Sequence, residues 1–426
     1  MNKKSEVLIP IIVIVIGLLC FGLSFVFKDK IDDKGGNGGN NDGNNDTTYV
    51  GNYNSNLIKA VHEDKKGSNY LLSPYSIEIA LDLLKEGANN DTLKEFNKAV
   101  PDRTFKDLNS TNVRISNATF INERYKGVVE KTFTDNLTNK YHAEVIIDNI
   151  TPEIINGWAK EKTNGMIDKV VNQITPDFVF GVINAVALDL KFQYQFECNR
   201  TKEVEFTKVD NTTMKVPMMN ATYKKDIKYV VNDDYSSIAL PYKSEGEYNY
   251  ELVAILPKDL DGFINSLNDE KLNNVMKDAK EANDKMNVYL SLPQFNYDFK
   301  LEDSDFITVL NKLGINLAFD AVKADFSRFI TKENMKKVNI PNLSVTKAVH
   351  KTFIDLNEVG TKATAVTYFG LDKSIIEKPE VVHINFNRPF VYMIRETGTN
   401  EILFFGIVYE PKEWTGSTCT RIDREL

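Results

Sequence analysis

Residues 358–380, EVGTKATAVTYFGLDKSIIEKPE, place strand-forming residues in a stretch that is flanked like a long loop. Apart from Lys362, the side chains from Thr361 to Thr367 are small or β-branched, and they show no helical apolar period. A strand alternates its faces, so one set of small residues would share a side. That set is Thr361, Ala363, Ala365 and Thr367. The segment therefore has the pattern of a strand without an evident place in a sheet.

Composition and motifs narrow the classes of function. The net charge of −8 argues against a nucleic-acid partner, because a phosphate backbone would be repelled. No G-x-S-x-G, H-E-x-x-H, Walker or C-x-x-C motif occurs, and the four histidines show no metal-ligand spacing. We therefore expect no enzyme activity, no cofactor and no metal. Three cysteines do not make a disulfide framework, although a Cys198–Cys419 bridge is possible.

The amino terminus predicts a membrane segment. After the basic residues 1–6, residues 7–27 (VLIPIIVIVIGLLCFGLSFVF) carry no charge, and a spanning helix needs about 20 such residues. We interpret this run as a transmembrane signal-anchor, with the bulk of the chain extracellular. The alternative is that the segment is cleaved and the protein is secreted.

The rest of the chain divides into three parts. Residues 28–48 are rich in Gly and Asn and predict a flexible linker. No break interrupts residues 49–411, which favours one large domain, and residues 412–426 form a tail without periodicity. Helical spacing in PYSIEIALDLLKEGA and DSDFITVLNKLGI, together with strand-like runs such as YELVAILP and ILFFGIVY, predicts an α+β fold.

Several stretches coincide, in order, with the signatures of one family. They are LLSPYSIEIALDLLKEGANNDT, ISNATFIN, INGWAKEKTNGMIDKV, VINAVALD, SIALPYK, LVAILPKD, LSLPQF, LNKLGI, ADFSRF, VTKAVHKTFIDLNEVGTKATAV and NFNRPFVYMIRETGTNEILFFGIVYEP. The ordered set resembles the serpins. The resemblance implies the family's fold, which has three β-sheets, about nine helices and an exposed reactive-centre loop.

Under this resemblance the opening stretch becomes intelligible. In inhibitory serpins the loop is cleaved, and its amino-side half inserts as a new strand in the central sheet. Uniformly small residues suit a strand that enters a sheet already packed underneath. Gly360 fits a backbone pivot, and Glu358 matches the acid at the base of the hinge. An ordinary flexible loop rich in Ala and Thr is the alternative interpretation.

The resemblance also implies a mechanism and a partner. A target serine protease, with cysteine proteases as further candidates, would attack the loop as a substrate and become trapped as an acyl-enzyme. Family spacing from Gly360 places the scissile bond between Ser374 and Ile375, with Lys373 as the alternative residue before the bond. We expect a monomer. The competing hypothesis is a non-inhibitory serpin that serves as a protease substrate or a binding module.

Further positions carry over from the family. Ser73, Ser76, Asn184 and His350 match the polar cluster beneath the strands that must part. Two departures stand out. Phe192 occupies the position where the family usually has Trp, and Gln294 replaces the basic partner often found for the hinge acid. We expect the loss of that charge pair to ease the opening of the sheet.

Overall fold

A computed structural model describes residues 12–22, 52–100, 102–165, 167–244, 246–283, 285–361 and 380–416. The scissile bond between Ser374 and Ile375, its alternative Lys373, and the hinge residues Ala363, Ala365 and Thr367 lie outside the described residues. The linker over 28–48 also lies outside them.

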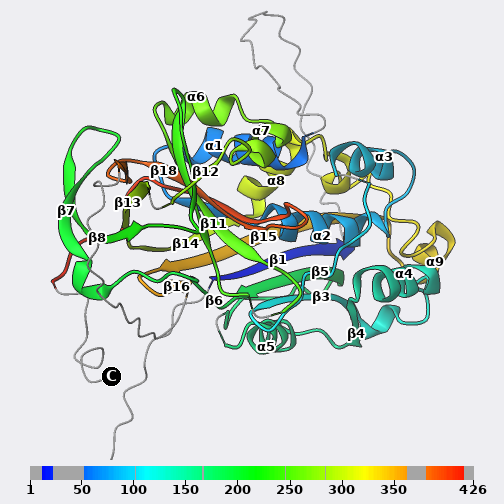
Figure 1. Ribbon diagram of the computed structural model, residues 1–426. Coiled ribbons are helices and arrows are strands. Elements are labelled where there is room, and N and C mark those ends of the chain that lie inside the picture. The colour runs from blue at the N-terminus through cyan, green and yellow to red at the C-terminus, as the bar shows by residue number, and fades with distance from the viewer. Residues whose placement is uncertain are drawn as a thin grey trace, which may run out of the picture.

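A six-stranded sheet, here called the central sheet, runs through the middle of the molecule (Figure 1). Its strands, in spatial order, are β14 (Phe295–Glu302), β15 (Leu343–Leu356), β1 (Ile12–Gly22), β5 (Phe178–Leu188), β3 (Val113–Asn122) and β4 (Glu144–Asp148). The pairs are antiparallel except for β3 with β4. Every residue of β5 is buried, as expected for a central strand that is covered on both faces.

Two further sheets complete the β-structure. A seven-stranded sheet contains β12 (Lys280–Glu281), β9 (Lys228–Val231), β10 (Tyr235–Pro241), β11 (Tyr250–Pro257), β18 (Phe390–Glu396), β19 (Ile402–Val408) and β2 (Tyr70–Leu72). A four-stranded sheet contains β17 (Glu380–Asn385), β13 (Met286–Pro293), β8 (Thr213–Tyr223) and β7 (Lys202–Thr207). A short ladder pairs β16 (Gly360–Thr361) with β6 (Leu190–Lys191). The three expected sheets are therefore present.

The described residues form nine α-helices. These are α1 (Tyr53–Lys65), α2 (Pro74–Lys85), α3 (Asn90–Ala99), α4 (Lys131–Tyr141), α5 (Pro152–Lys162), α6 (Leu260–Asn265), α7 (Asp269–Asn274), α8 (Asp303–Lys312) and α9 (Lys332–Lys337). The α+β fold with three sheets and about nine helices is confirmed.

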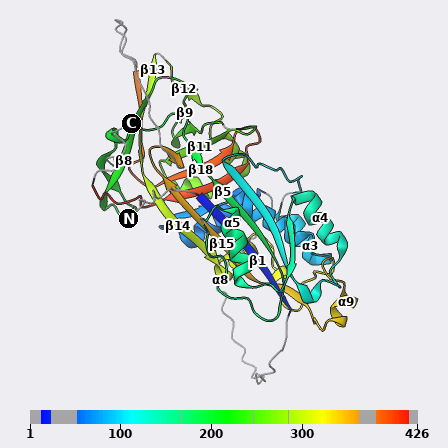
Figure 2. The same ribbon diagram turned by 90° about the horizontal axis from the view of Figure 1, so that it is seen from below.

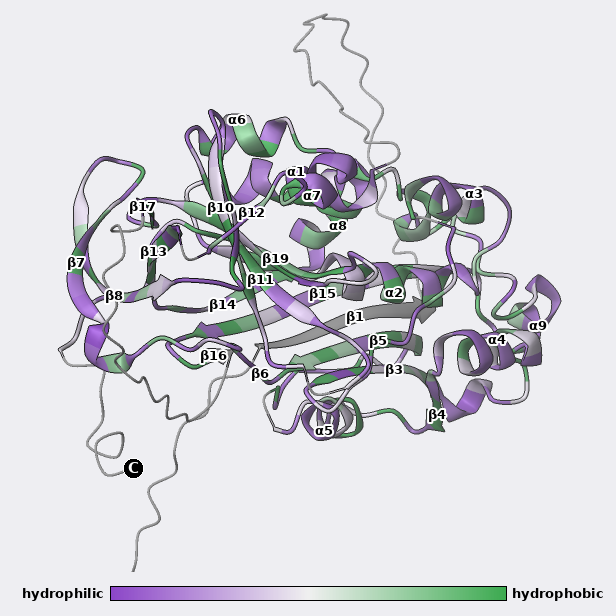
Figure 3. Ribbon diagram, viewed as in Figure 1, coloured by the Kyte–Doolittle hydropathy of each residue, from purple (hydrophilic) through white to green (hydrophobic). Residues whose placement is uncertain are grey.

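Helix α2 carries the main core. Ser73 caps its amino terminus, and Pro74 occupies the first turn, where a missing N–H costs nothing. The helix is buried on all sides, and its apolar residues alternate with a few polar ones (Figure 3). It contacts β1 and β5 of the central sheet and β19 of the seven-stranded sheet, so it lies between the two sheets. On the other face α5 covers the central sheet, where Trp158 packs edge-on against Phe120.

The amino-terminal prediction requires a correction. Residues 12–22, the middle of the expected membrane segment, form strand β1 between β15 and β5 (Figures 1 and 2). Among the described residues, no helix combines the length and the apolar character that crossing a membrane requires. Apolar runs of this length favour a membrane helix by composition alone, but Ile12–Ile16 (IVIVI) is β-branched throughout and also suits a strand.

Part of the predicted tail is ordered by backbone hydrogen bonds. The N–H of Lys412 donates to the carbonyl of Gln294 at 3.3 Å, and the N–H of Trp414 donates to the carbonyl of Lys215 at 2.8 Å. Residues 412–416 have no regular secondary structure, as the sequence predicts. The tail therefore starts across the end of β14 and the four-stranded sheet.

Candidate functional site

The hinge begins where β15 ends and the backbone reverses. Asn357 and Gly360 form an antiparallel bridge, and Gly360 has a φ of 132°, a conformation that favours glycine. Gly360 and Thr361 then pair with Lys191 and Leu190. A Cβ on Gly360 would lie 2.6 Å from the Leu190 carbonyl oxygen. The expected pivot at Gly360 is therefore consistent with both its dihedral angle and its close contact.

Glu358 is buried below this turn and accepts two side-chain hydrogen bonds. The Thr201 hydroxyl donates to Oε1 at 2.5 Å, and Gln294 Nε2 donates to Oε2 at 2.8 Å. The backbone of Glu358 also accepts from the N–H of Phe196 at 2.8 Å. Gln294 thus takes the position expected for a basic partner, but it contributes a neutral donor. Nearby, burial raises the pKa of Asp355 to about 6.

Phe192 occupies the centre of the aromatic packing beside the hinge. Its ring stacks on Tyr242 with centroids 5.1 Å apart and an interplanar angle of 3°, and it meets Phe196 edge-on. Its N–H donates to the carbonyl of Val359 at 2.9 Å. Phe192 is fully buried, so a ring without the indole N–H fits here because no polar atom of the side chain needs a partner.

The four residues predicted for the polar cluster meet where the start of α2 (Ser73 and Ser76) contacts the strands β5 (Asn184) and β15 (His350). Ser73 caps α2 by accepting from the N–H of Ser76 at 3.1 Å, and the Ser76 hydroxyl donates to Oδ1 of Asn184. The N–H of Ser73 reaches Nε2 of His350 at 3.4 Å. All four residues are buried, so these contacts replace hydrogen bonds to water.

The cluster continues beyond the predicted residues. Asn184 Nδ2 donates to Oδ1 of Asn117 at 2.7 Å, and Asn117 Nδ2 donates to the carbonyl of Tyr141 at 2.8 Å. Asn117 thereby links β5 and β3 to the end of α4. In the sequence, only the family motif ISNATFIN, which contains Asn117, points to a role for this residue. Thr201, the partner of Glu358, had no such signal.

His350 is held neutral in this cluster. Its side chain is fully buried, and burial lowers its pKa to about 3. Because Nε2 accepts from the Ser73 N–H, the ring serves as a hydrogen-bond acceptor rather than a charged group. A proton on Nε2 would break this contact with the Ser73 N–H.

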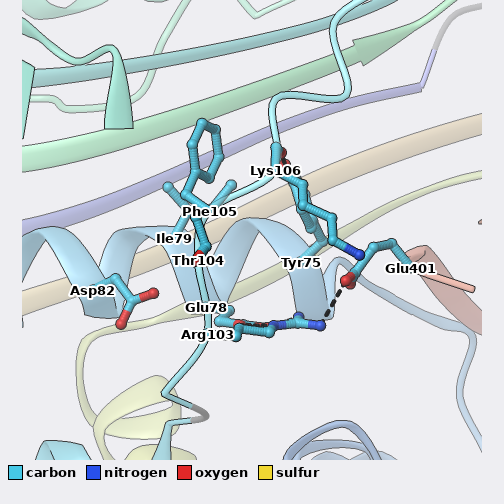
Figure 4. Close-up of a pocket in the computed structure, with 9 residues that line it drawn as sticks. All are labelled: Tyr75, Glu78, Ile79, Asp82, Arg103, Thr104, Phe105, Lys106 and Glu401. Atoms are coloured by element: carbon cyan, nitrogen blue, oxygen red, sulfur yellow. Dashed lines mark hydrogen bonds and ion pairs between the residues drawn. The ribbon is translucent and has the colours of Figure 1, made fainter. Parts of the chain in front are cut away.

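A small pocket beside α2 is already occupied by an internal ion-pair network. Arg103 lies between Glu78 and Glu401, donating to each carboxylate at 2.6 Å (Figure 4). Burial raises the pKa of Glu78, and burial likewise raises the pKa of Asp82 to about 7. Arg103 therefore pairs with two of the pocket's carboxylates, which indicates a structural role.

The remaining chemical groups are sparse. Within the described residues, no group of three or more His, Cys, Asp or Glu side chains is arranged to hold a metal ion. Cys198, three residues before Thr201, is disulfide-bonded. The site is therefore a backbone hinge with a buried polar support.

The described fold thus combines a six-stranded central sheet, a backbone hinge at the end of β15 and a buried polar cluster beside the start of α2. A sequence model described as "Serpin (serine protease inhibitor)" matches residues 49–411. The chain belongs to the serpin family.

Curated relatives match over most of their length. The chain is 27% identical to alpha-1-antitrypsin 1-5 of Mus musculus, over 93% of this chain and 96% of that protein. It is 29% identical to alpha-1-antiproteinase of Bos taurus, over 85% of this chain and 88% of that protein.

Solved structures show the same architecture. The thermophilic serpin tengpin in its native state superimposes with a TM-score of 0.68 at 28% identity, covering 89% of this chain and 97% of that chain. Thyroxine-binding globulin in complex with thyroxine gives a TM-score of 0.67 at 21% identity, covering 85% of this chain and 98% of that chain. The second likeness is evidence for the fold alone.

Proposed function

We propose that this protein inhibits serine endopeptidases by covalent trapping, with cysteine proteases as further candidate targets. The protease attacks the loop after Ser374, the peptide bond to Ile375 breaks, and the carbonyl of Ser374 becomes an ester on the enzyme. The freed arm then inserts into the central sheet and carries the tethered enzyme with it. About fourteen residues at about 3.3 Å each amount to some 45 Å.

The observation that carries this proposal is the short ladder between β16 and β6. Gly360 and Thr361 pair with Lys191 and Leu190, directly beyond the end of β5. If this antiparallel ladder continued, Ala363 would lie opposite Leu188, Ala365 opposite Val186 and Thr367 opposite Asn184. Directly opposed residues project to the same face. The small loop residues would therefore face the main core, as insertion requires.

The length of the arm also agrees with the sheet. In the same continued register Ser374 would lie opposite Asp177, immediately before β5 begins at Phe178. Lys373 would lie opposite Phe178. An arm from Thr361 to either residue thus spans the whole of β5, which supports a scissile bond at this distance from Gly360.

We also propose that the protein acts as a monomer outside the cytoplasm. The disulfide at Cys198 supports an oxidising compartment, because cytosolic thiols are usually kept reduced. A membrane anchor over residues 7–27 is not part of the proposal, since Ile12–Gly22 is a strand of the central sheet.

A second candidate is a non-inhibitory serpin that is cleaved as a substrate or binds a partner. The specific observation in its favour is that β1 already fills the place between β15 and β5. A loop that finds this place occupied would be cut, and the protease would leave unharmed.

The test is to incubate the purified full-length chain with a trypsin-like, a chymotrypsin-like and an elastase-like protease. Denaturing gels would show a complex that survives SDS, and the mass of the released fragment would separate Ser374 from Lys373. Stoichiometric complex with any of the three supports the proposal. Clean cleavage with full recovery of protease activity, both by this chain and by the strand-disrupted variants described below, would overturn it.

A further inference from the structure

Strand β1 takes the place in the central sheet that an inserting loop would need. It is antiparallel to β15 on one side and to β5 on the other, and β15 and β5 do not pair with each other in the described structure. A chain that leaves β15 and turns back at Gly360 must also run antiparallel to β15. β1 and an inserted loop therefore have the same direction.

The registers on the β5 side make the overlap specific. Thr361 pairs with Leu190, and Ile12 pairs with Leu188. Continuing from Thr361 would place Ala363 opposite Leu188, where Ile12 lies. In the same continued register, Thr364 would lie opposite Ala187, which pairs with Val13 in the structure.

The β15 side gives the same register. Asn357 is bridged to Gly360, and Val13 pairs with Phe353. Continuing the ladder from the bridge would place Thr364 opposite Phe353, where Val13 lies. Two separate ladders thus assign Val13 to the position of Thr364. Because one residue of slippage would turn every side chain to the opposite face, this agreement is informative.

We propose that residues 12–22 are an internal competitor strand, which holds the central sheet closed to the reactive loop until it is withdrawn. The inference rests on the proposed function, since it concerns the regulation of the same sheet position. The loop is paired as far as Thr361, which lies opposite Leu190. Strand β1 begins at Ile12 opposite Leu188, two positions further along the same neighbouring chain, so the end of one segment lies next to the start of the other. Residues 23–51 connect β1 to α1, so the strand can leave without a chain cut.

The test disrupts β1 through its backbone in the full-length chain. Successive N–H groups of a central antiparallel strand point to opposite neighbours, so Ile16→Pro with Gly17→Pro removes a donor toward β5 and one toward β15. Ile16 and Gly17 lie in the middle of both ladders. The matched control places the same two prolines in the linker, as Asn40→Pro with Asn41→Pro. Gly17→Pro alone is the milder variant, if the double variant fails to fold.

Three measurements are made on each chain. Hydrogen exchange is measured at residues 12–22, and exchange at β11 and β18 shows whether the rest of the fold is intact. The melting temperature is recorded before and after a protease cuts the loop. The rate of SDS-stable complex formation is measured with the protease found above. We expect protection of residues 12–22 in the parent and the linker control, and its loss in the β1 variants. Compared with the parent, the β1 variants should also gain more in melting temperature when the loop is cleaved. They should form the SDS-stable complex at least about tenfold faster.

The outcomes separate this inference from the proposed function. If residues 12–22 of the parent exchange as fast as the linker, or if all chains form complex at one rate, the competitor strand is wrong and inhibition can still stand. A different set of results would reject inhibition and keep the competitor strand. In that case residues 12–22 of the parent are protected from exchange, cleavage stabilises only the β1 variants, and no chain traps a protease.

Discussion

Gln294 donates a hydrogen bond of 2.8 Å to Glu358, and this pair joins the start of β14 to the base of the hinge. Glu358 is buried, and Thr201 donates to its other carboxylate oxygen. In the proposed mechanism the hinge moves when the loop inserts, and the contact between Gln294 and Glu358 would resist that movement. A neutral amide binds a carboxylate more weakly than a charged donor does, which leaves the contact weaker than a salt bridge at the same position.

Replacing the amide by an amine should therefore slow the opening. We expect Gln294→Lys to reduce spontaneous loop insertion about two- to fivefold, corresponding to about 0.5–1 kcal/mol from the stronger contact. The measurement is the rate at which the chain converts, on mild heating, to a form that no longer traps protease. Gln193→Lys adds the same charge at an exposed position nearby and is the control. An unchanged rate in Gln294→Lys would contradict the assigned role.

Gly360 should tolerate no side chain. Its φ of 132° is strained for other residues, and a Cβ would lie 2.6 Å from both the Leu190 carbonyl oxygen and the Phe192 nitrogen. We expect Gly360→Ala to lower the free energy of unfolding by about 1–3 kcal/mol. It should also increase exchange at the Phe192 amide, which donates to Val359. Gly157→Ala in the middle of α5, where a Cβ would meet no atom within 4 Å, should instead raise the free energy of unfolding by about 0.5–1 kcal/mol and leave exchange at the Phe192 amide unchanged. Equal behaviour of the two variants would argue against a tight hinge.

The sequence predicted the parts of this site that are carried by motifs. Ser73 and Ser76 belong to a capped helix, and Asn184 and His350 lie within strand-like runs, so their positions followed once the order of the blocks indicated the fold. Thr201 and Asn117 were missed because each is an ordinary residue whose role arises only when distant strands come together.

The amino-terminal strand could not be predicted from its own residues. An uninterrupted apolar run has no alternation that would distinguish a membrane helix from a strand buried on both faces. Length favours the helix, since the run extends from residue 7 to 27, whereas β-branching at Ile12–Ile16 favours the strand. The choice depends on whether a sheet offers two free edges, and that is a property of the folded domain.

His350 should make stability depend on pH. Burial holds its pKa at about 3, below the value near 6.5 of an exposed imidazole. The unfolded chain therefore takes up this proton first as the pH falls, so the free energy of unfolding decreases from about pH 6.5 downward. In His350→Gln this contribution is absent. As the pH falls from 6 to 4, we expect the free energy of unfolding of the parent to decrease relative to that of His350→Gln by about 1.4 kcal/mol per pH unit.

Denaturant titrations at pH 7.5, 6, 5 and 4 would measure this shift. His383→Gln removes an exposed imidazole on strand β17 and is the control. Parallel curves for the parent and His350→Gln would mean that the imidazole is not buried as described. Asp82 and Asp355, whose pKa values are raised by burial, act in the opposite direction but are common to all three chains.

The partner of Cys198 provides an independent test of where β1 lies. Cys20 is opposite Phe180, near the start of β5, whereas Cys198 is held beside the hinge, because Phe196 and Thr201 both bind Glu358. The distance from Phe180 to the hinge end at Leu190 is about 30 Å along an extended strand. A disulfide requires Cα atoms within about 7 Å. With β1 in the sheet, Cys20 is out of reach of Cys198, so we expect the disulfide partner of Cys198 to be Cys419.

Peptide mapping of the full-length chain without reduction should thus yield a Cys198–Cys419 pair and a free Cys20. The variant Cys20→Ser should keep that pair, and Cys419→Ser should leave Cys198 as a free thiol, because Cys20 is out of reach. The N–H of Trp414, five residues before Cys419, donates to the carbonyl of Lys215 in β8, and β8 pairs with β7, which follows Cys198 in the chain. A Cys198–Cys20 peptide from the parent would show that residues 12–22 do not occupy this register, and the competitor strand would be abandoned.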